Sequence, residues 1–221
     1  MRAPDFWQRQ PEAPGLLARI LTPLGWVYAA GTAARLRGGT GYRAGIPVIC
    51  VGNINAGGTG KTPVVIALTE RLVARGIQVA VVSRGHGGQL SGPVRVDPTA
   101  HDAGDVGDEP ILLSAFTSVY VARDRAEGVR MAEADGAGIV LMDDGFQNPS
   151  VAKDASLIVV DAETGFGNGR VLPAGPLREP VGPGLERGDV MIAVGGDAAQ
   201  ARFHELWNEK ISLPVVKAEL K

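Results

Sequence analysis

The sequence has a single cysteine, Cys50, which lies inside an apolar run. One cysteine cannot build a disulfide framework, so a disulfide-stapled secreted domain is excluded and a reducing compartment is expected. Cys50 itself is expected to be a small core residue rather than a reactive thiol. Histidine is also scarce, and His101 and His204 lack neighbours in a metal-ligand pattern. No zinc site is predicted.

The sequence also has no large excess of positive or negative charge, because the net charge is only −2 over 221 residues. Nothing in this balance favours nucleic acid, and no obligate protein partner is inferred. Hydrophobic residues make up 45% and charged residues 21%, which excludes disorder and allows one large α/β domain or two small ones. The charge is uneven, however: the chain up to Arg43 carries six arginines against Asp5 and Glu12. The N-terminal arm is therefore basic.

No long hydrophobic run is uninterrupted. Residues 16–34 are almost long enough to span a bilayer, but Arg19 and Pro23 interrupt them. Thr22 followed by Pro23 is typical of an N-cap and a first helical position, which predicts two short helices. Tryptophans beside arginines favour a helical arm over residues 1–45 that lies in a membrane interface, although a helical pair packed on the core or a true span would show similar composition. A signal peptide is not expected.

The strongest motif is IPVICVGNINAGGTGKT, residues 46–62, in which a β-rich apolar run leads through a glycine-rich turn into a helix-forming run. This layout wraps backbone N–H groups around a polyphosphate, with Lys61 reaching the β- and γ-phosphates and the Thr62 hydroxyl holding Mg²⁺. Asn55 stands where the first glycine of the G-x-x-x-x-G-K-[ST] pattern belongs, and we expect it to adopt the positive φ that asparagine tolerates. The alternative is a glycine-rich turn with a chance Gly-Lys-Thr. The predicted nucleotide-binding residues are Asn55, Ala56, Gly57, Gly58, Thr59, Gly60, Lys61 and Thr62.

From residue 46 to residue 221 apolar strand-like runs alternate with helix-like runs. Continuously apolar strands with helices between them predict an α/β fold, a P-loop NTPase-like parallel sheet with helices on both faces. Such sheets bind ligands at the carboxyl ends of their strands. The expected strands are 46–51, 78–83, 118–122, 138–142, 156–160 and 190–194, with a further strand-like run at 213–220, and the expected helices are 62–75, 109–115, 123–134 and 198–208.

Polar residues follow several of these strands. Arg84 and His86 lie in a glycine-rich loop after the second strand, where they either contact substrate or are solvated. Asp108 and Glu109 open a short helix. They either serve as helix-terminal acids or supply a general base (Asp108) and a Mg²⁺ ligand (Glu109) for phosphoryl transfer. Arg125, after the third strand, could face a phosphate or a carboxylate.

The run Ile139 to Asp144 is the second strong signal, because four buried apolar residues lead to two acids at the end of a strand. This is a Walker-B arrangement, which places a carboxylate near Mg²⁺. We assign Asp143 as a Mg²⁺ ligand and Asp144 as a catalytic residue that makes a hydrogen bond outside the metal's ligand shell. Farther on, residues 165–187 are rich in glycine and proline and are too long for an idle connection, which favours a substrate loop over a linker.

Five segments occur in a distinctive order, and together they resemble the tetraacyldisaccharide 4′-kinases, the lipid A 4′-kinases of Gram-negative bacteria. The resemblance covers essentially the whole chain. It implies transfer of the ATP γ-phosphate, with Mg²⁺, to the 4′-hydroxyl of a tetraacyl glucosamine disaccharide 1-phosphate at the cytoplasmic face of the inner membrane, with the arm as a peripheral attachment. It also implies that Arg178 and Glu179 match a loop pair near the active site. The segments are GNINAGGTGKTP (52–63), SRG (83–85), GDEP (107–110), DDGFQ (143–147) and LPAGPLRE (172–179).

The sequence departs from the family pattern in three places. Many relatives have tyrosine where His86 stands and histidine where Asn148 stands. Family members also continue into a second lobe that supplies a histidine to assist the GDEP aspartate, whereas this sequence ends at Lys221, so that lobe is expected to be absent or truncated. Two other functions share the phosphate loop: a partition or septum-site ATPase switch, and a non-catalytic nucleotide-binding fragment. The switch proteins carry a lysine where Ala56 stands, and they do not explain the Asp143-Asp144 pair.

Overall fold

The computed structural model describes residues 3–39 and 41–220. These residues form two compact parts, and each part combines distant segments of the sequence. We name the parts by the features they carry. The phosphate-loop part contains residues up to Gly38, the segment Asn53–Gly60 and the residues from Leu157 onward. The carboxylate part contains Gly39–Gly52 and Lys61–Ser156. The predicted division into an N-terminal arm, residues 1–45, and a nucleotide-binding domain, residues 46–221, stays a prediction.

The carboxylate part is built on strands in the order β3-β4-β2-β5-β1. Parallel pairing joins β2 to β4, β2 to β5 and β1 to β5, whereas the two-residue β3 runs antiparallel along β4. Because their directions agree, the carboxyl ends of the four longer strands lie at one edge. The strands are β1 (Val48–Gly52), β2 (Val79–Ser83), β3 (Val94–Arg95), β4 (Ser118–Val121) and β5 (Ile139–Asp143).

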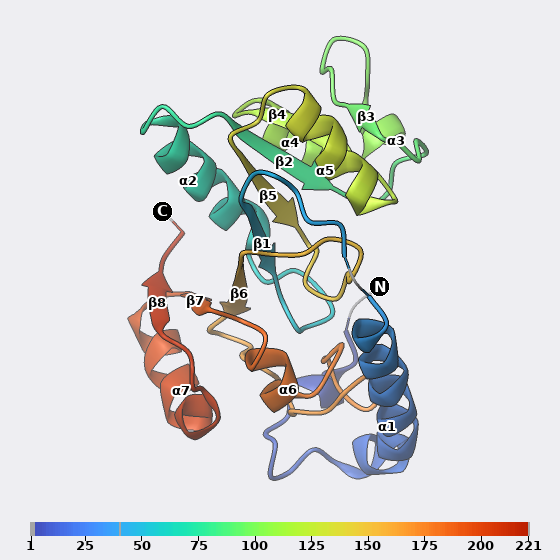
Figure 1. Ribbon diagram of the computed structural model, residues 1–221. Helices are drawn as coiled ribbons and strands as arrows, with labels where there is room; N and C mark the ends of the chain where they lie inside the picture. Colours follow the sequence, from blue (N-terminus) through green and yellow to red (C-terminus); the bar gives the residue numbers. More distant parts are fainter. Residues whose placement is uncertain (1–2, 40, 221) are drawn as a thin grey trace. The chain divides into compact units, whose positions relative to one another are not determined.

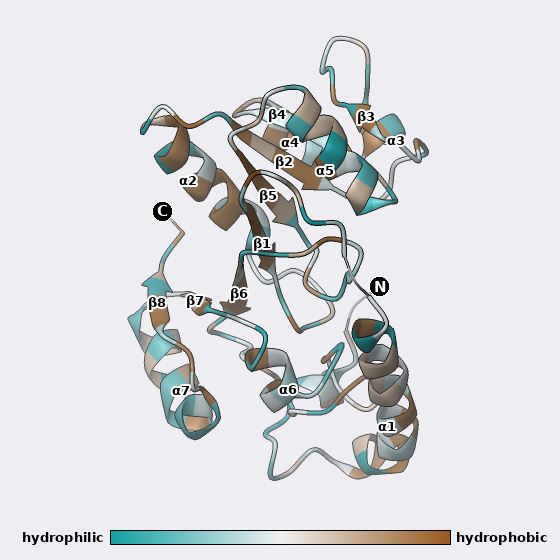
Figure 2. Cartoon of the chain, in the orientation of Figure 1, coloured by the Kyte–Doolittle hydropathy of each residue, from teal (hydrophilic) through white to brown (hydrophobic). Residues whose placement is uncertain are grey.

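Every residue of β2 and β5 is buried. Successive side chains of a strand point to opposite faces, so both faces of this sheet are covered. The helix α2 (Lys61–Val73) packs on β1, β2 and β5, and α5 (Arg125–Ala134) packs on β2 and β4. Figure 1 shows these two helices on either side of the strands, and Figure 2 shows how apolar β1, β2 and β5 are. The predicted α/β fold with a covered parallel sheet is confirmed.

Two short helices connect β3 to β4. They are α3 (Ala103–Val106) and α4 (Asp108–Ser114), and Gly107 separates them with a φ of 93°. A side chain at Gly107 would collide with the backbone of the loop after β2, because its Cβ would lie 2.5 Å from the carbonyl oxygen of His86. The close approach requires glycine at this position. The GDEP segment and the SRG loop are therefore packed against each other.

The phosphate-loop part holds three parallel strands, β6 (Ala155–Asp161) from Leu157 onward, β7 (Val190–Val194) and β8 (Val215–Ala218). Around them lie α6 (Val181–Leu185), α7 (Asp197–Trp207) and the 3-10 helix η2 (Asn208–Lys210). Phe166 stacks edge-on against Phe203 and Trp207, with ring centroids 5.7 and 5.0 Å apart. This aromatic cluster attaches the start of the 165–187 segment to α7.

The N-terminal arm consists of the 3-10 helix η1 (Asp5–Gln8) and α1 (Leu16–Arg37). The prediction of two short helices with Thr22 as an N-cap was wrong, because α1 continues through Pro23. Contacts on both sides of the proline hold the helix: Thr22 bonds within the helix to Ala18, and Gly25 packs on the backbone of Val171. Tertiary packing here overrides the helix-breaking tendency of proline. Across the described residues, no helix is both long enough and apolar enough to cross a membrane.

Candidate active site

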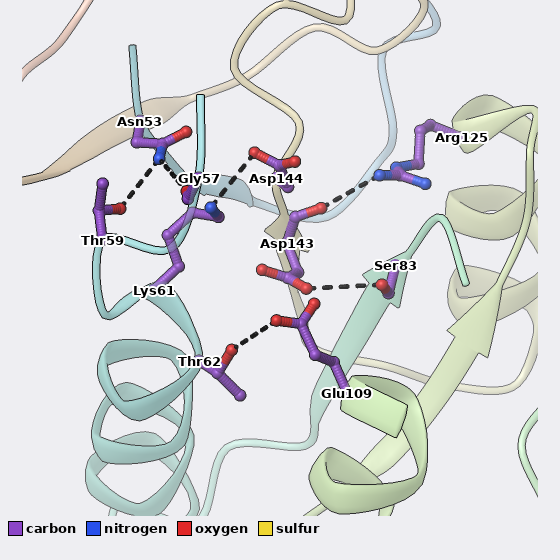
Figure 3. A network of polar contacts seen from close by, with 10 residues as sticks. All are labelled: Asn53, Gly57, Thr59, Lys61, Thr62, Ser83, Glu109, Arg125, Asp143 and Asp144. Atoms are coloured by element: carbon purple, nitrogen blue, oxygen red, sulfur yellow. Dashed lines mark hydrogen bonds and ion pairs between the residues drawn. The ribbon is translucent and has the colours of Figure 1, made fainter. Parts of the chain in front are cut away.

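The phosphate-binding loop follows β1 and turns on two glycines, Gly57 and Gly60, whose φ values are 118° and 79°. Within it, the Asn53 amide donates to the Thr59 hydroxyl at 3.0 Å and to the carbonyl of Gly57 at 3.3 Å (Figure 3). These bonds close the loop on itself. Asn53 was not predicted as a site residue, although its place directly after a buried strand was a signal that could have found it.

Asn55 does not use the left-handed conformation that we expected. In the described part of the chain the only non-glycine residue with positive φ is Asp144. Asn55 is instead buried and forms an antiparallel bridge with Leu177, while its amide donates to the carbonyl oxygen of Gly165 at 2.9 Å. The side chain of Asn55 thus attaches the loop to residue 165, and its backbone does not adopt a positive φ.

Lys61 and Thr62 follow this loop in the chain and open α2, so their positions as the ends of a Gly-Lys-Thr motif are those a phosphate loop requires. The Lys61 Nζ lies 3.6 Å from Oδ1 of Asp144, with the lysine side chain 12% exposed and the aspartate 36% exposed. Thr62 Oγ1 donates to Glu109 Oε1 at 3.1 Å. One helix turn thus contacts acids from two other elements, the end of β5 and the start of α4.

Asp143 is the most buried acid of this group, at 2% exposure. Its Oδ2 accepts a hydrogen bond from Ser83 at 3.4 Å, and its Oδ1 has no hydrogen-bond partner in the described residues. Burial, reinforced by the charges of Glu109 and Asp144 and opposed by those of Lys61 and Arg125, raises the pKa of Asp143 to about 6. A buried carboxylate with an unpaired oxygen is costly, and a cation beside it would remove that cost.

Asp144 has a φ of 50°, which is uncommon for a residue with a side chain. The next residue is also constrained, since a Cβ at Gly145 would lie 2.2 Å from the Met142 side chain. The turn after β5 therefore holds Asp143 and Asp144 in two different directions. Asp144 is directed to Lys61, and Asp143 accepts from Ser83 (Figure 3). The two roles assigned from the sequence stay predictions, and the structure shows that the two side chains have different partners.

Arg125 does not lie at an open surface. It is 3% exposed, and its guanidinium donates to the carbonyl oxygens of Ala122 at 3.1 Å and Asp143 at 3.2 Å. Burial lowers the pKa of this guanidinium, and the neighbouring charge of Arg84 acts in the same direction, whereas Asp143 and Asp144 raise it. The predicted substrate contact of Arg125 stays a prediction. What the structure shows is a buried cation that supports the end of β5.

The other predicted residues fall into two sets. In the carboxylate part, Asp108, Arg84 and His86 are exposed, and the loop that carries Arg84 and His86 packs against the residues before α4. Because the N-cap of α4 is Gly107, which has no side chain, neither Asp108 nor Glu109 is the capping residue. Both acids lie in the first turn of α4, as the helix-terminal alternative also expects, and the side chain of Glu109 is turned to Thr62.

In the phosphate-loop part, Arg178 lies beside the phosphate loop: its backbone N–H donates to the Ile54 carbonyl at 2.7 Å. Glu179 is buried and forms an ion pair with Arg187. Arg178 is thus placed next to residues that precede the glycine turn, whereas Glu179 supports the fold of its own segment.

The donor set suits a Mg²⁺ ion that arrives with a nucleotide. Thr62 offers a hydroxyl, Glu109 a carboxylate 3.1 Å from it, and Asp143 an unpaired buried oxygen. Over residues 3–39 and 41–220 no three His, Cys, Asp or Glu side chains are grouped as a self-sufficient metal site. Nucleotide-dependent enzymes bind Mg²⁺ through one or two carboxylates plus phosphates and water, so a full protein cage is not required.

A glycine-rich loop that ends in Gly-Lys-Thr at the start of a helix, with paired acids at the end of a neighbouring parallel strand, defines a P-loop nucleotide-binding fold. The sequence profile of the family described as tetraacyldisaccharide-1-P 4′-kinase, LpxK, matches residues 17–221. The chain belongs to this family. Membership favours the kinase interpretation over a partition-type ATPase switch.

Individual relatives agree. The chain is 62% identical to the tetraacyldisaccharide 4′-kinase of Dinoroseobacter shibae and 55% identical to that of a Jannaschia species, in each case over its full length. It spans 66% of the length of each of these relatives. Among solved structures it is similar to LpxK from Aquifex aeolicus in complex with ATP, with a TM-score of 0.74 and 26% identity, covering 91% of this chain and 64% of that one.

Proposed function

We propose that this protein transfers the γ-phosphate of ATP to the 4′-hydroxyl of a tetraacyl glucosamine disaccharide 1-phosphate, a precursor of lipid A. The observation that carries the proposal is the meeting of Lys61, Thr62, Glu109, Asp143 and Asp144 in one polar cluster. Phosphoryl transfer needs this combination, because charge on the transferred group must be neutralised while the nucleophile is positioned. Family membership and the ATP complex of the Aquifex relative point to the same reaction.

In this mechanism the glycine turn of residues 55–60 offers backbone N–H groups to the phosphates, and Lys61 adds its ammonium to the β- and γ-phosphate oxygens. Asp144, paired with Lys61, holds that ammonium in place until the nucleotide arrives. Mg²⁺, when bound, would neutralise charge on the β- and γ-phosphates. Thr62, Glu109 and Asp143 are the residues that would hold it.

Asp108 is assigned to the acceptor hydroxyl. It is exposed, it is the first residue of α4, and its neighbour Glu109 is turned to Thr62. An exposed carboxylate at this place is available to take the proton from the 4′-hydroxyl as the phosphoryl group transfers. Arg84 and His86, in the loop packed against the residues before α4, are proposed to contact the acceptor, and Arg178 to lie near the nucleotide.

We further propose that the arm attaches the protein peripherally to the cytoplasmic face of the inner membrane. Helix α1 buries small residues, Ala18, Gly25 and Thr32, spaced by seven, and turns its large apolar residues outward. Trp26 and Val27 are 70% and 71% exposed. Together with Arg19, Arg35 and Arg37 this composition suits a helix lying on an anionic lipid surface. The exposed apolar residues of α1 are Leu16, Leu17, Ile20, Leu24, Trp26, Val27 and Tyr28.

The test is a thin-layer assay that follows the labelled γ-phosphate of ATP, with and without the disaccharide acceptor. Product formed only with the acceptor supports the kinase, whereas phosphate released at the same rate without it would favour an ATPase switch. The Asp108→Ala variant should lose turnover by about 10²-fold or more while its ATP affinity stays normal. Asp197→Ala is the matched control, because Asp197 is also an exposed first residue of a helix that follows a glycine.

If Asp108→Ala instead lost ATP affinity and kept turnover, the assignment of the base would be wrong. If the protein bound no ATP and formed no product, the proposed function itself would be rejected.

A further inference from the structure

The segment 165–178 contacts both the phosphate loop and the N-terminal arm, and all three belong to the phosphate-loop part. Its first attachment is to residues 54–56. The N–H of Ala56 donates to the carbonyl of Pro176 at 2.6 Å, and the N–H of Arg178 donates to the carbonyl of Ile54 at 2.7 Å. With the Asn55 amide on the Gly165 carbonyl, three hydrogen bonds fix the backbone just before the glycine turn.

The same segment is folded around one buried side chain, Asn168, which is 2% exposed. The amide nitrogen of Asn168 donates to the Ala174 carbonyl at 2.9 Å, and its oxygen accepts from the N–H of Arg170 at 3.1 Å. The fit is close, because a Cβ at Gly175 would lie 2.1 Å from that oxygen. Asn168 therefore sets the shape of the turn that ends at Pro176, where the phosphate loop is attached.

Asn168 also makes the contact to the arm. Its amide nitrogen donates a second hydrogen bond to the carbonyl oxygen of Phe6 at 3.1 Å, and its backbone N–H donates to that of Trp7 at 2.8 Å. The Trp7 indole returns a hydrogen bond to the Pro173 carbonyl at 3.1 Å. The amide nitrogen of Asn168 thus donates to both the arm and the turn, and its oxygen accepts from the turn. A change on one side alters the hydrogen bonding of the other.

Helix α1 is attached to the same segment. Arg170 donates to the Thr22 hydroxyl at 2.8 Å, and a Cβ at Gly25 would lie 2.9 Å from the Val171 carbonyl oxygen. The contacts of η1 and α1 thus lie on residues 167–174, and the contacts of the phosphate loop lie on residues 165 and 176–178. Figure 1 shows α1 beside this segment.

We propose that Asn168 is a positioning residue that couples the N-terminal arm to the phosphate loop, so that docking of the arm sets the affinity for nucleotide. The coupling rests on the proposed function only in its last step, the binding of nucleotide by the loop. The physical path is short: arm to Asn168, Asn168 to the turn at Pro176, and Pro176 to Ala56. A substitution that loosens the arm therefore lowers the population of the loop conformation that binds phosphate.

The experiment perturbs the arm without touching the loop. Trp7→Phe combined with Thr22→Val removes the two hydrogen bonds that the arm side chains make to Pro173 and Arg170. Trp26→Phe is the matched control, because it makes the same chemical change on the same arm at an exposed position. Thr22→Ser in place of Thr22→Val should restore the bond to Arg170. Asn168→Asp removes both donors of the amide and keeps its shape.

Two readouts are measured on each folded variant: ATP affinity by calorimetry, and amide hydrogen exchange of residues 54–57 without nucleotide. Exchange of residues 79–83, in β2, serves as the reference for global stability. The arm variant and Asn168→Asp should exchange about three- to tenfold faster at 54–57 with β2 unchanged, and should bind ATP more weakly by a similar factor. Trp26→Phe should change neither the ATP affinity nor the exchange rate at 54–57. The double variant with Trp7→Phe and Thr22→Ser should show values closer to those of the wild-type protein.

Unchanged exchange at 54–57 in the arm variant and in Asn168→Asp would overturn the coupling. Equal acceleration at 54–57 and at 79–83 would also overturn it, since this would show a loss of stability rather than a local effect. If the unvaried protein bound no ATP, the proposed function would fail, whereas the exchange data would still decide the coupling.

Discussion

The hydroxyl of Thr62 lies 3.1 Å from the carboxylate of Glu109 and joins the first turn of α2 to the first turn of α4. These residues are 47 positions apart: Thr62 follows the glycine-rich phosphate loop, and Glu109 lies just after Gly107, which separates α3 from α4. The contact brings the end of the Gly-Lys-Thr motif to the GDEP segment. It gives the second acid of GDEP a specific partner within the nucleotide-binding motif.

The first prediction concerns this contact. Thr62→Val should raise the Mg²⁺ concentration needed for half-maximal activity by about tenfold or more, because a hydroxyl ligand is lost and Glu109 loses its partner. Thr62→Ser should stay near normal. Thr69→Val is the control on the same helix, since Thr69 is buried and its hydroxyl has no hydrogen-bond partner in the described residues. Equal Mg²⁺ dependence of Thr62→Val and Thr69→Val would rule out the assigned role.

The second prediction follows from the raised pKa of Asp143, about 6. An aspartate in the unfolded chain titrates near 4, so between about pH 4 and 6 the folded protein binds more protons than the unfolded chain. The free energy of unfolding should therefore fall as the pH rises through this window, and the loss is complete above it. Asp143→Asn removes the effect, so the variant should gain about 2 kcal/mol over the unvaried protein between pH 4 and pH 7.

Urea unfolding in EDTA at several pH values measures this difference. EDTA keeps divalent cations away from the carboxylate. Asp197→Asn, which alters an exposed acid, is the control and should show no such gain. A stability difference for Asp143→Asn that is constant with pH, or that favours the unvaried protein more at pH 7 than at pH 4, would contradict the assigned shift.

Much of this fold follows from local sequence. The strands were predicted to within a few residues because continuously apolar runs such as 139–142 suit a sheet that is covered on both faces. The meeting of Lys61 with the acid pair at the end of β5 was also predictable, since parallel strands bring their carboxyl ends to one edge. The edge strand β3 and the helices α3 and α6 were missed, because two to five residues carry too little pattern to distinguish.

Contacts between residues far apart in the chain could not be predicted from the sequence. The role of Asn55 depends on Gly165, which is 110 residues away, so the local motif suggested backbone conformation instead of a side-chain bond. The helix through Pro23 depends on contacts with residues 170 and 171 in the same way. Arg125 was expected to face a ligand because it follows a strand, and the hydrogen bonds that it donates to carbonyl groups at the ends of β4 and β5 depend on tertiary packing that the sequence does not show. In each case tertiary packing decided the outcome.

The third prediction asks whether Arg125 supports the end of β5 or contacts the substrate. Arg125→Lys should lower kcat by about tenfold or more with little change in the KM for the lipid acceptor, because lysine cannot donate to both the Ala122 and Asp143 carbonyls in one plane. Arg123→Lys, at an exposed neighbour, is the control. Steady-state kinetics with varied acceptor makes the measurement. A raised KM for the acceptor with normal kcat would support the substrate contact instead.

The fourth prediction concerns α1. Trp26→Ser together with Val27→Ser should weaken binding to anionic phosphatidylglycerol vesicles by about tenfold or more, because two large apolar side chains no longer enter the interface. Binding of the unvaried protein should also weaken as salt is raised, since the arginines of α1 are attracted electrostatically. Vesicle sedimentation measures both effects. Leu206→Ser on α7, 47% exposed, is the control; a loss equal to that of the α1 variant would refute a specific role for the arm.

The last prediction tests the departure at Asn55. Asn55→Gly restores the glycine of the general motif, and by the motif alone it should be harmless. In this protein it removes the amide that binds the buried Gly165 carbonyl and adds backbone freedom to the unfolded chain. The free energy of unfolding should fall by about 1–3 kcal/mol, and hydrogen exchange at residues 54–57 should accelerate.

Asn55→Asp separates the two causes, because it loses the donor and keeps the side-chain volume without the added freedom of glycine. It should reproduce most of the loss of exchange protection at 54–57. Gly57→Ala tests backbone conformation in the same loop: its φ of 118° disfavours any side chain, although no atom lies within 4 Å of the added Cβ. An Asn55→Gly variant as stable as the unvaried protein, beside a destabilised Gly57→Ala, would show that the loop depends on glycine freedom rather than on its attachment to residue 165.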